Sequence, residues 1–514
     1  MEVLRMIVYE NLSSCIFVSL LFAGMLTWPH LVDEIKLRRY PLVGKERSRA
    51  ERVKTYILSA YSAYEEGRRE YEDKFHRMTT IDGDHVIVPN KYLDELRQRP
   101  DSEIDSQHPF NRIFENQYTG VFPTRSNTEL VNQVVKAELT RSLARINPRL
   151  STEVERTVRE ELPPCDDWTG VNVSNALMQI VAIVSGHIFL GPELCRSPDY
   201  LRSAVDYTVY IATAANLLKS WPSWMRGIIF LIRPEFRRLR QLRRDMKLFL
   251  KPLIEERRTK IRNGEQLSDD MLSWMLVKTE AKGMRDLTHL TNMQLLLTMA
   301  AIHTTTFTAA RILYDLAAHP ETVKDLRHEI RTVLDQNDGV MTTKALFDLK
   351  LMDSVMRESQ RLNPAFSDGF RRYTFKRIML KDGTCIPANC FIEAANGPVL
   401  RDAAFYPDPD KFLPTRFLSL RTNPTTPDPI GYKNREQYQF VSVTKENMSF
   451  GFGRHACPGR FFAANEIKLI LARMLLEYDV RMPDGVEGPY ENFHFGAVNG
   501  VDGTKEIMMR TVKR

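Results

Sequence analysis

A single cysteine, Cys457, lies in the stretch FGFGRHACPGRFFAANE, residues 450–466. The glycines ahead of it allow a tight loop, and Pro458 suits the first turn of the apolar helix that the following residues predict. The cysteine is therefore expected at a helix N-terminus, where free backbone N–H groups and the positive end of the helix dipole stabilise a thiolate. Such a thiolate can act as a nucleophile or as a metal ligand.

Each chemistry of a thiolate requires different neighbours. A nucleophile needs a positioned base, and His455 is only two residues away. Zinc requires further cysteine or histidine ligands at short spacing, and beyond His455 none is near. Iron in a haem needs one protein ligand, and cysteine is among those that serve. A buried structural cysteine would leave the surrounding pattern as a coincidence.

The pattern resembles the haem-binding loop of the cytochrome P-450 superfamily, the haem-thiolate monooxygenases, which reads Phe-x-x-Gly-x-x-x-Cys-x-Gly. The resemblance implies haem b, iron protoporphyrin IX, with the cysteine thiolate as axial ligand of the iron. All fixed positions of the loop are occupied here, by Phe450, Gly453, Cys457 and Gly459.

The cations expected at the haem propionates depart from the family pattern. The family usually has arginine two residues before the cysteine, whereas this chain has His455, with Arg454 beside it. Either cation could meet a propionate. By the same analogy Arg372 meets the other propionate, although an ordinary surface arginine fits the sequence as well.

A second motif, RESQRL, places Glu358 and Arg361 three residues apart, on one face of a predicted helix. Alone, such a pair is usual on a solvated helix. The resemblance implies instead a buried network completed by Arg416 of the segment FLPTRF. Buried charges need partners, so the network would serve folding and haem retention rather than chemistry.

A third motif lies in the long apolar helix LLLTMAAIHTTTFTAARIL, which resembles the distal helix of the family. The resemblance implies that small residues let dioxygen and substrate approach, and that Thr304 positions dioxygen and a water for proton delivery. Without the resemblance, Ala and Thr here would only ease helix packing. His303 stands where an acid is usual. It can relay a proton, or it can be a packed core residue while water carries protons.

The elements around these motifs are mostly helical. Apolar residues recur at helical spacing, and short strand-like pieces appear near HVIVP and after residue 370. One of them predicts a hairpin that turns at Asp382-Gly383. We expect a mainly α (α+β) chain, a helix-rich cytochrome P-450-type fold with small peripheral sheets. The helical runs are 130–144, 175–190, 236–261, 292–318 and 343–362.

The N-terminus carries an uncharged stretch, Leu12–Trp28, at the lower edge of the length that spans a bilayer. Basic residues follow it, which predicts one transmembrane helix, a single-pass membrane protein of the endoplasmic reticulum, and a catalytic domain that faces the cytosol. Residues 1–44 would form the anchor and proline hinge, and residues 45–514 the haem-thiolate domain. A cleaved signal peptide is the alternative. Asn216–Pro234 is read either as a second membrane contact or as a buried loop.

Net charge and cysteine content indicate which partners and which compartment this protein has. The formal charge of +7 is mildly basic, and no recognition motif indicates nucleic acid as a partner. The basic helix face 237–247 is read as a solvated face or as a surface for anionic lipid or an acidic redox partner. The cysteines are too sparse for a disulfide framework, which indicates a reducing compartment. They are Cys15, Cys165, Cys195, Cys385, Cys390 and Cys457.

Taken with the resemblance, the sequence predicts an oxidoreductase: a membrane-anchored monooxygenase that uses dioxygen and electrons from a separate NADPH-dependent reductase, since no flavin domain is visible. A haem-thiolate isomerase or dehydratase and a non-catalytic haem sensor are the rival functions. The motifs look most like fungal anchored members related to ent-kaurene oxidase, which implies secondary-metabolite biosynthesis.

The expected substrate is a bulky apolar small molecule, with a terpenoid or meroterpenoid first and an indole alkaloid or polyketide hybrid as alternatives. By family analogy four segments line its pocket, and they are rich in aromatic and small residues. These segments are Phe114–Phe122, Asn216–Trp224, Pro364–Phe370 and Phe493–Val498.

Overall fold

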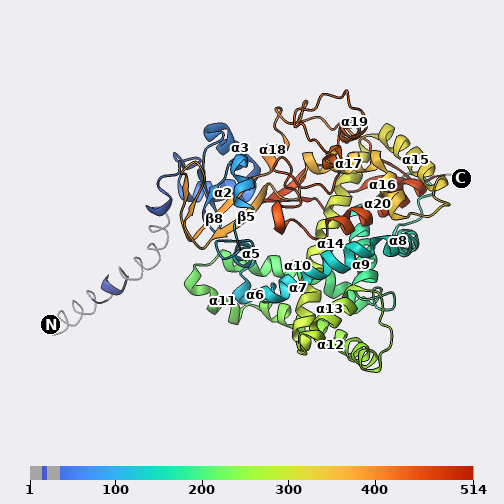
Figure 1. The fold of residues 1–514 in the computed structure, drawn as a ribbon, viewed down its shortest axis with the longest axis horizontal. Helices are drawn as coiled ribbons and strands as arrows, with labels where there is room; N and C mark the ends of the chain where they lie inside the picture. The colour runs from blue at the N-terminus through green and yellow to red at the C-terminus, as the bar shows by residue number, and fades with distance from the viewer. Residues whose placement is uncertain (1–13, 15, 20–34, 513–514) are drawn as a thin grey trace.

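The computed structural model describes residues 14, 16–19 and 35–512, and helices make up most of this part of the chain (Figure 1). Its longest helix is α14 (Leu287–Ala317), which packs against α9 (Val173–Phe189), α10 (Pro198–Lys219) and α12 (Pro234–Asn263). Two thirds of α14 is buried, because apolar residues surround it on nearly every side. α14 is therefore the central element against which the other helices are arranged.

The other helices surround this centre, and a turn of π-helix at Val135–Leu139 joins two of them. They are α2 (Arg49–Leu58), α3 (Ala60–Tyr71), α4 (Leu93–Leu96), α5 (Gln107–Ile113), α6 (Asn116–Thr119), α7 (Arg125–Val134), α8 (Thr140–Glu161), α11 (Arg226–Ile232), α13 (Met271–Ala281), α15 (Pro320–Asp335), α16 (Thr343–Asp348), α17 (Lys350–Leu362), α18 (Gly397–Leu400), α19 (Arg416–Thr422) and α20 (Arg460–Glu477).

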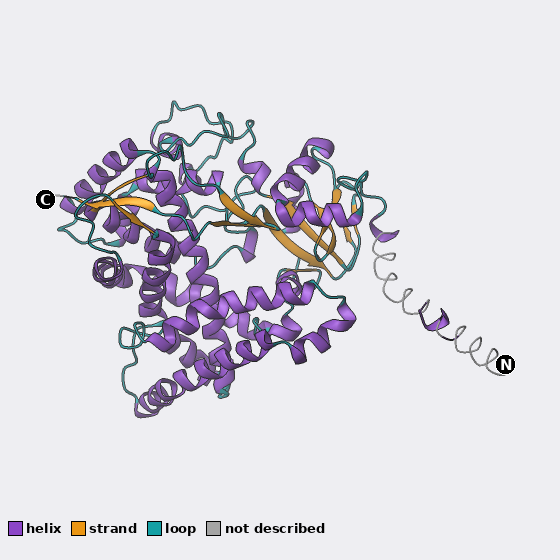
Figure 2. Ribbon diagram, turned by 180° about the vertical axis from the view of Figure 1, so that it is seen from behind, coloured by secondary structure: helices purple, strands orange, loops and turns teal. Residues whose placement is uncertain are grey.

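The strands form small sheets, and Figure 2 shows them in one half of the molecule while the other half is helical. The largest sheet has five strands in the order β1-β2-β8-β5-β3, and three smaller sheets have the orders β4-β12-β9, β10-β11 and β6-β7. The bounds are β1 (His76–Thr80), β2 (Gly83–Ile87), β3 (Ile104–Asp105), β4 (Thr169–Val171), β5 (Asp368–Thr374), β6 (Ile378–Met379), β7 (Cys385–Ile386), β8 (Cys390–Ala395), β9 (Tyr478–Arg481), β10 (Asn492–Phe495), β11 (Val498–Val501) and β12 (Ile507–Thr511).

The helix-rich architecture with small sheets is confirmed. The hairpin predicted at Asp382-Gly383 is the antiparallel pair β6 and β7. The predicted run 343–362 is divided at Leu349 into two helices, α16 and α17. The carboxylate of Glu329 on α15 accepts hydrogen bonds from the N–H groups of Leu351 (2.6 Å) and Met352 (3.0 Å), which caps the start of α17. Helical periodicity cannot show such a contact.

The structure contradicts the prediction of a single-pass membrane protein. In the part of the chain that the structure describes, no helix has both the length and the apolar character that a bilayer crossing requires. Most of the segment Leu12–Trp28 lies outside the described residues. The alternative reading of Asn216–Pro234 as a buried loop is also wrong, because this segment contains α11 and exposes apolar side chains such as Trp224 and Leu231.

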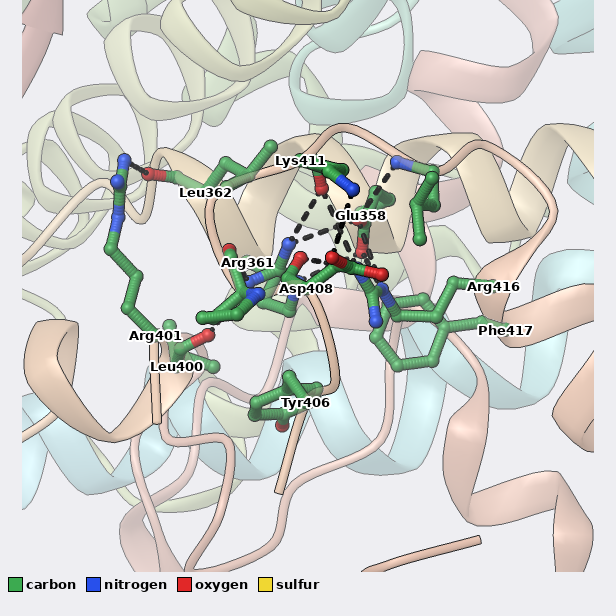
Figure 3. A network of polar contacts seen from close by, with 12 residues as sticks. Glu358, Arg361, Leu362, Leu400, Arg401, Tyr406, Asp408, Lys411, Arg416 and Phe417 are labelled. Atoms are coloured by element: carbon green, nitrogen blue, oxygen red, sulfur yellow. Dashed lines mark hydrogen bonds and ion pairs between the residues drawn. The ribbon is translucent and has the colours of Figure 1, made fainter. Parts of the chain in front are cut away.

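A buried network joins α17 to the loop that leads into α19 (Figure 3). The side chains of Glu358 and Arg361 have no exposed surface. Arg361 donates from Nε and Nη2 to the two carboxylate oxygens at 2.9 Å, and Arg416 donates from Nε to both oxygens at 3.1 Å. The backbone N–H of Leu413 adds a further bond at 3.0 Å. One carboxylate is thus shared by two guanidinium groups.

The same guanidinium groups also hold the backbone of the loop. Arg361 donates to the carbonyls of Leu400 (2.9 Å), Pro409 (2.6 Å) and Lys411 (3.2 Å), and Arg416 donates to the carbonyl of Asp408 at 3.0 Å. Residues 401–415 form neither helix nor strand. Because buried carbonyls need donors, the arginines replace the partners that regular structure would provide.

Replacing Glu358 by alanine is expected to lower stability by about 3–5 kcal/mol, because two arginines would lose their carboxylate in a buried site. Thermal unfolding followed by circular dichroism measures the loss. Asp348→Ala is the matched control, since its ion pair with Lys344 also lies within a helix but the Lys344 side chain is 73% exposed. That control should cost less than about 1 kcal/mol. Equal losses in the two variants would contradict a special role for the network.

Candidate functional site

The loop of Cys457 is shaped by its backbone. The N–H of Cys457 donates to the carbonyl of Phe450 at 2.7 Å, which closes the loop. Gly451 and Gly453 have φ angles of 77° and 73°, a region that favours glycine. A Cβ atom at Gly453 would also lie 2.9 Å from the Cβ of Arg97. Both glycines are therefore required by the geometry of the loop.

The thiol of Cys457 lies deep in the protein, and yet Cys457 is the one exposed cysteine among the described residues. Burial raises the pKa of Cys457, although the N–H groups of Gly459 and Arg460 and the charge of Arg460 act in the opposite direction. A side chain that is both accessible and enclosed by protein faces an interior space. Helix α20 begins at Arg460, so the expected helix N-terminus lies just beyond the cysteine.

The central helix α14 exposes a narrow face as well. Ala300 and Thr304, one turn apart, are exposed, although most of α14 is buried. The Thr304 hydroxyl donates to the carbonyl of Ala300 at 2.7 Å, and the Thr308 hydroxyl donates to the carbonyl of Thr304 at 2.8 Å. The helix thus presents small and hydroxylated side chains where a bulky residue would fill the space.

His303 is turned toward α10 rather than along this face. Its Nε2 lies 3.2 Å from the carbonyl oxygen of Val205, and its ring meets Phe307 edge-on. Burial lowers the pKa of His303, so the ring is neutral near pH 7 and Nε2 is the donor. The structure therefore shows His303 as a packed side chain that joins α14 to α10.

Arg372 is a buried guanidinium without an acid. It donates to the backbone carbonyls of Arg371 (2.8 Å) and Phe452 (3.2 Å) and lies over the ring of Phe370. It forms no ion pair with any carboxylate in the described chain, and burial lowers the pKa of Arg372 to about 10. An uncompensated buried cation next to the cysteine loop fits an anionic group such as a haem propionate.

The two other candidate cations already have a partner. Arg454 Nη2 and His455 Nε2 lie 2.6 and 2.8 Å from the same oxygen of Asp101. Burial lowers the pKa of His455, while the Asp101 carboxylate raises it. The structure brings these residues together on the outer side of the loop, and a sequence separation of more than 350 residues hides this contact from sequence analysis.

A small cavity of about 30 Å³ lies along α14, beyond Thr304. Thr308 and Arg311 of α14 and Gln360 of α17 are among its lining residues. Arg311 Nε and Gln360 Oε1 are buried and have no hydrogen-bond partner among the described residues. A cavity of this size, with several polar side chains in its lining, fits one water molecule. Sequence analysis missed it, because its lining residues are far apart along the chain.

Comparison with known proteins identifies the family. The family model described as Cytochrome P450 matches residues 86–503, which include Thr304 and Cys457. The chain is 32% identical over 478 residues to Cytochrome P450 monooxygenase braC of Annulohypoxylon truncatum, covering 92% of this chain and 93% of the relative. It is 35% identical over 447 residues to penP of Penicillium crustosum, covering 84% and 82%.

A third relative, paxP of Penicillium paxilli, is 33% identical over 422 residues, which is 81% of this chain and 78% of the relative. Each of the three is named a cytochrome P-450 monooxygenase. Enzymes of this family bind iron protoporphyrin IX through a cysteine thiolate and use dioxygen, a small-molecule substrate and a redox partner. Since the family model covers most of the sequence, the chain belongs to the cytochrome P-450 family and is a monooxygenase of that family.

Proposed function

We propose that this monooxygenase binds its haem through Cys457 and oxidises a bulky apolar secondary metabolite in a fungal pathway, with a terpenoid or meroterpenoid as the substrate class. The observation that carries the cofactor assignment is the thiol of Cys457, which is enclosed by the protein yet open to an interior space. The fungal sources of the relatives support the pathway.

Different residues around the loop would bind different parts of the haem. Cys457 would ligate the iron, while Phe450, Gly453 and Gly459 give the loop its shape. Arg372 would contact a propionate, because it is the candidate cation that lacks an acid. Arg454 and His455 would act indirectly, since Asp101 already engages both of them.

When bound, the haem supplies the activation of dioxygen that inserts one oxygen atom into a C–H bond. The protein must deliver protons and exclude bulk water. Thr304 is the hydroxyl on the open face of α14, and the water-sized cavity at Thr308 lies one turn further along the same helix. We therefore assign proton delivery to Thr304 and ordered water, and assign His303 to packing.

Contacts of three of the four segments expected at the substrate pocket support an apolar, aromatic lining. A bridge between Phe366 and Val498 joins the segments 364–370 and 493–498, and Phe493 contacts Phe307 of α14 edge-on. Tyr118 lies against Phe230, which brings the segment 114–122 to α11. These contacts support a pocket with apolar, aromatic walls and hence an apolar substrate.

Replacing Cys457 by serine is expected to abolish the thiolate-type absorption of the reduced carbon monoxide complex, because a hydroxyl does not supply the same electron density to iron. The difference spectrum of purified protein measures this. Cys165→Ser is the control, since that thiol is buried elsewhere in the fold and should leave the spectrum unchanged. A serine variant at 457 that keeps the thiolate band would reject the assignment of the ligand.

Thr304→Ala is expected to release more peroxide per NADPH consumed, because dioxygen and water lose their hydroxyl partner. Product and peroxide measured together, with a purified reductase, give the coupling. His303→Gln is the comparison, since its amide can still donate to the carbonyl of Val205. It should couple like the parent. A rise in peroxide for His303→Gln but not for Thr304→Ala would place the proton relay at the histidine instead.

The substrate class is tested by binding and turnover together. Terpenoids are expected to shift the haem spectrum and to give oxygenated products, whereas small polar compounds should do neither. The measurement is a titration of matched terpenoid, indole and polyketide panels, followed by mass spectrometry of reactions with reductase and NADPH. Turnover of an indole or polyketide panel alone would reject the terpenoid while leaving the monooxygenase intact.

A further inference from the structure

Three potential metal ligands meet at the end of α9, on elements that do not carry Cys457, Thr304 or Arg372. They are Glu153 of α8, His187 in the last turn of α9 and Cys195 in the segment between α9 and α10. One ligand atom from each side chain lies within 4.8 Å of the other two. Glu153 and Cys195 are buried, and His187 is nearly so.

One ring nitrogen of the histidine in this cluster is free to bind a ligand. His187 Nδ1 is buried and has no hydrogen-bond partner in the described part of the chain. The nearest oxygen of Glu153 is 3.7 Å away, which is too far for a hydrogen bond. A buried nitrogen without a partner is costly, unless a ligand binds it.

The carboxylate and the thiol are placed to share such a ligand. Oε1 of Glu153 accepts hydrogen bonds from Arg196 at 2.6 and 3.1 Å, which fixes the group and leaves Oε2 directed toward His187. The Cys195 thiol is engaged only weakly, with the carbonyl of Pro192 at 3.4 Å. Outer groups that orient a ligand in this way are usual around protein metal sites.

The charges around the cluster are compatible with a cation. Arg196 is the nearest positive group, and it pairs with both Glu153 and Glu160. The other arginines close by are also paired: Arg156 with Glu160 and Arg149 with Asp269. The two carboxylates at the cluster are thus balanced by two guanidinium groups, and loss of the thiol proton would give the cluster a net negative charge that a cation offsets.

We propose that Glu153, His187 and Cys195 bind one Zn²⁺ ion, with water as the fourth ligand. Sulfur, imidazole nitrogen and carboxylate oxygen are the ligands that zinc accepts, whereas Ca²⁺ and Mg²⁺ require oxygen. The ion replaces the proton of the Cys195 thiol, which passes to solvent, and no electrons are transferred. In a tetrahedral site the ligand atoms are about 3.3–3.6 Å apart, so the three side chains must approach by about 1 Å.

The bound ion would join α8, α9 and the segment that leads into α10. Helix α10 also carries Val205, the partner of His303 on α14. Because the ion would bridge these elements, its loss should lower thermal stability without removing the haem signature. These two readouts separate zinc binding from the proposed monooxygenase function.

The experiment uses the full-length holoprotein, treated with chelator and then dialysed against zinc chloride. Bound metal is measured by mass spectrometry, and X-ray absorption at the zinc edge reports the ligands without interference from haem iron. Cys195→Ser and His187→Gln test the ligands. Cys165→Ser is the matched control, because its thiol is also buried and also contacts a proline carbonyl, at 3.3 Å.

We expect about one zinc per parent protein, with one sulfur among its ligands. Cys195→Ser should remove the sulfur signal, and both ligand variants should weaken binding by more than about tenfold. Cys165→Ser should bind as the parent does. Zinc retention by the parent no greater than by Cys195→Ser, or affinity unchanged in His187→Gln, would overturn the proposal. The reduced carbon monoxide spectrum of each variant establishes that it is folded.

Discussion

The ion pairs that Arg361 and Arg416 form with the carboxylate of Glu358 are the interactions on which the arrangement around the haem loop depends. A buried carboxylate must receive donors, and here Arg361 and Arg416 provide them while their remaining N–H groups hold the carbonyls of the loop 400–411. α17 is joined in turn to α20, because Lys468 of α20 pairs with Asp353 of α17 at 2.9 Å. The helix that follows Cys457 is thereby fixed to the same framework as the network.

The polar groups of this network are hydrogen-bonded, whereas the site contains buried polar groups that lack an ion-pair partner among the described residues. Other buried charges are paired, as in the contact between Arg311 and Asp315 at 2.7 Å. Arg372 has no acid, and the thiol of Cys457 faces an interior space. Buried groups without partners are rare in folded proteins and indicate a place where a ligand belongs. Nδ1 of His187 is a buried group of the same kind.

Local chemistry made much of this predictable from the sequence. The glycine spacing around Cys457 and the i, i+3 spacing of Glu358 and Arg361 each describe a short segment, and the hairpin at Asp382-Gly383 depends on its own turn. Contacts between distant segments could not be predicted: Glu329 divides two helices, Val205 holds His303, and Asp101 engages Arg454 and His455. The apolar stretch and the basic residues after it predict a membrane anchor, whereas the described residues contain no spanning helix.

The pairing of β4 has a consequence for the order in which the protein is made. β4 lies between α8 and α9, but its neighbour in the sheet is β12, which follows Cys457 in the sequence. A ribosome therefore finishes α8 and the central helix α14 before α20, β9 and β12, which pack against one or both of them, exist. During that interval the nascent chain exposes the apolar surface that these later elements cover, and exposed apolar surface favours aggregation.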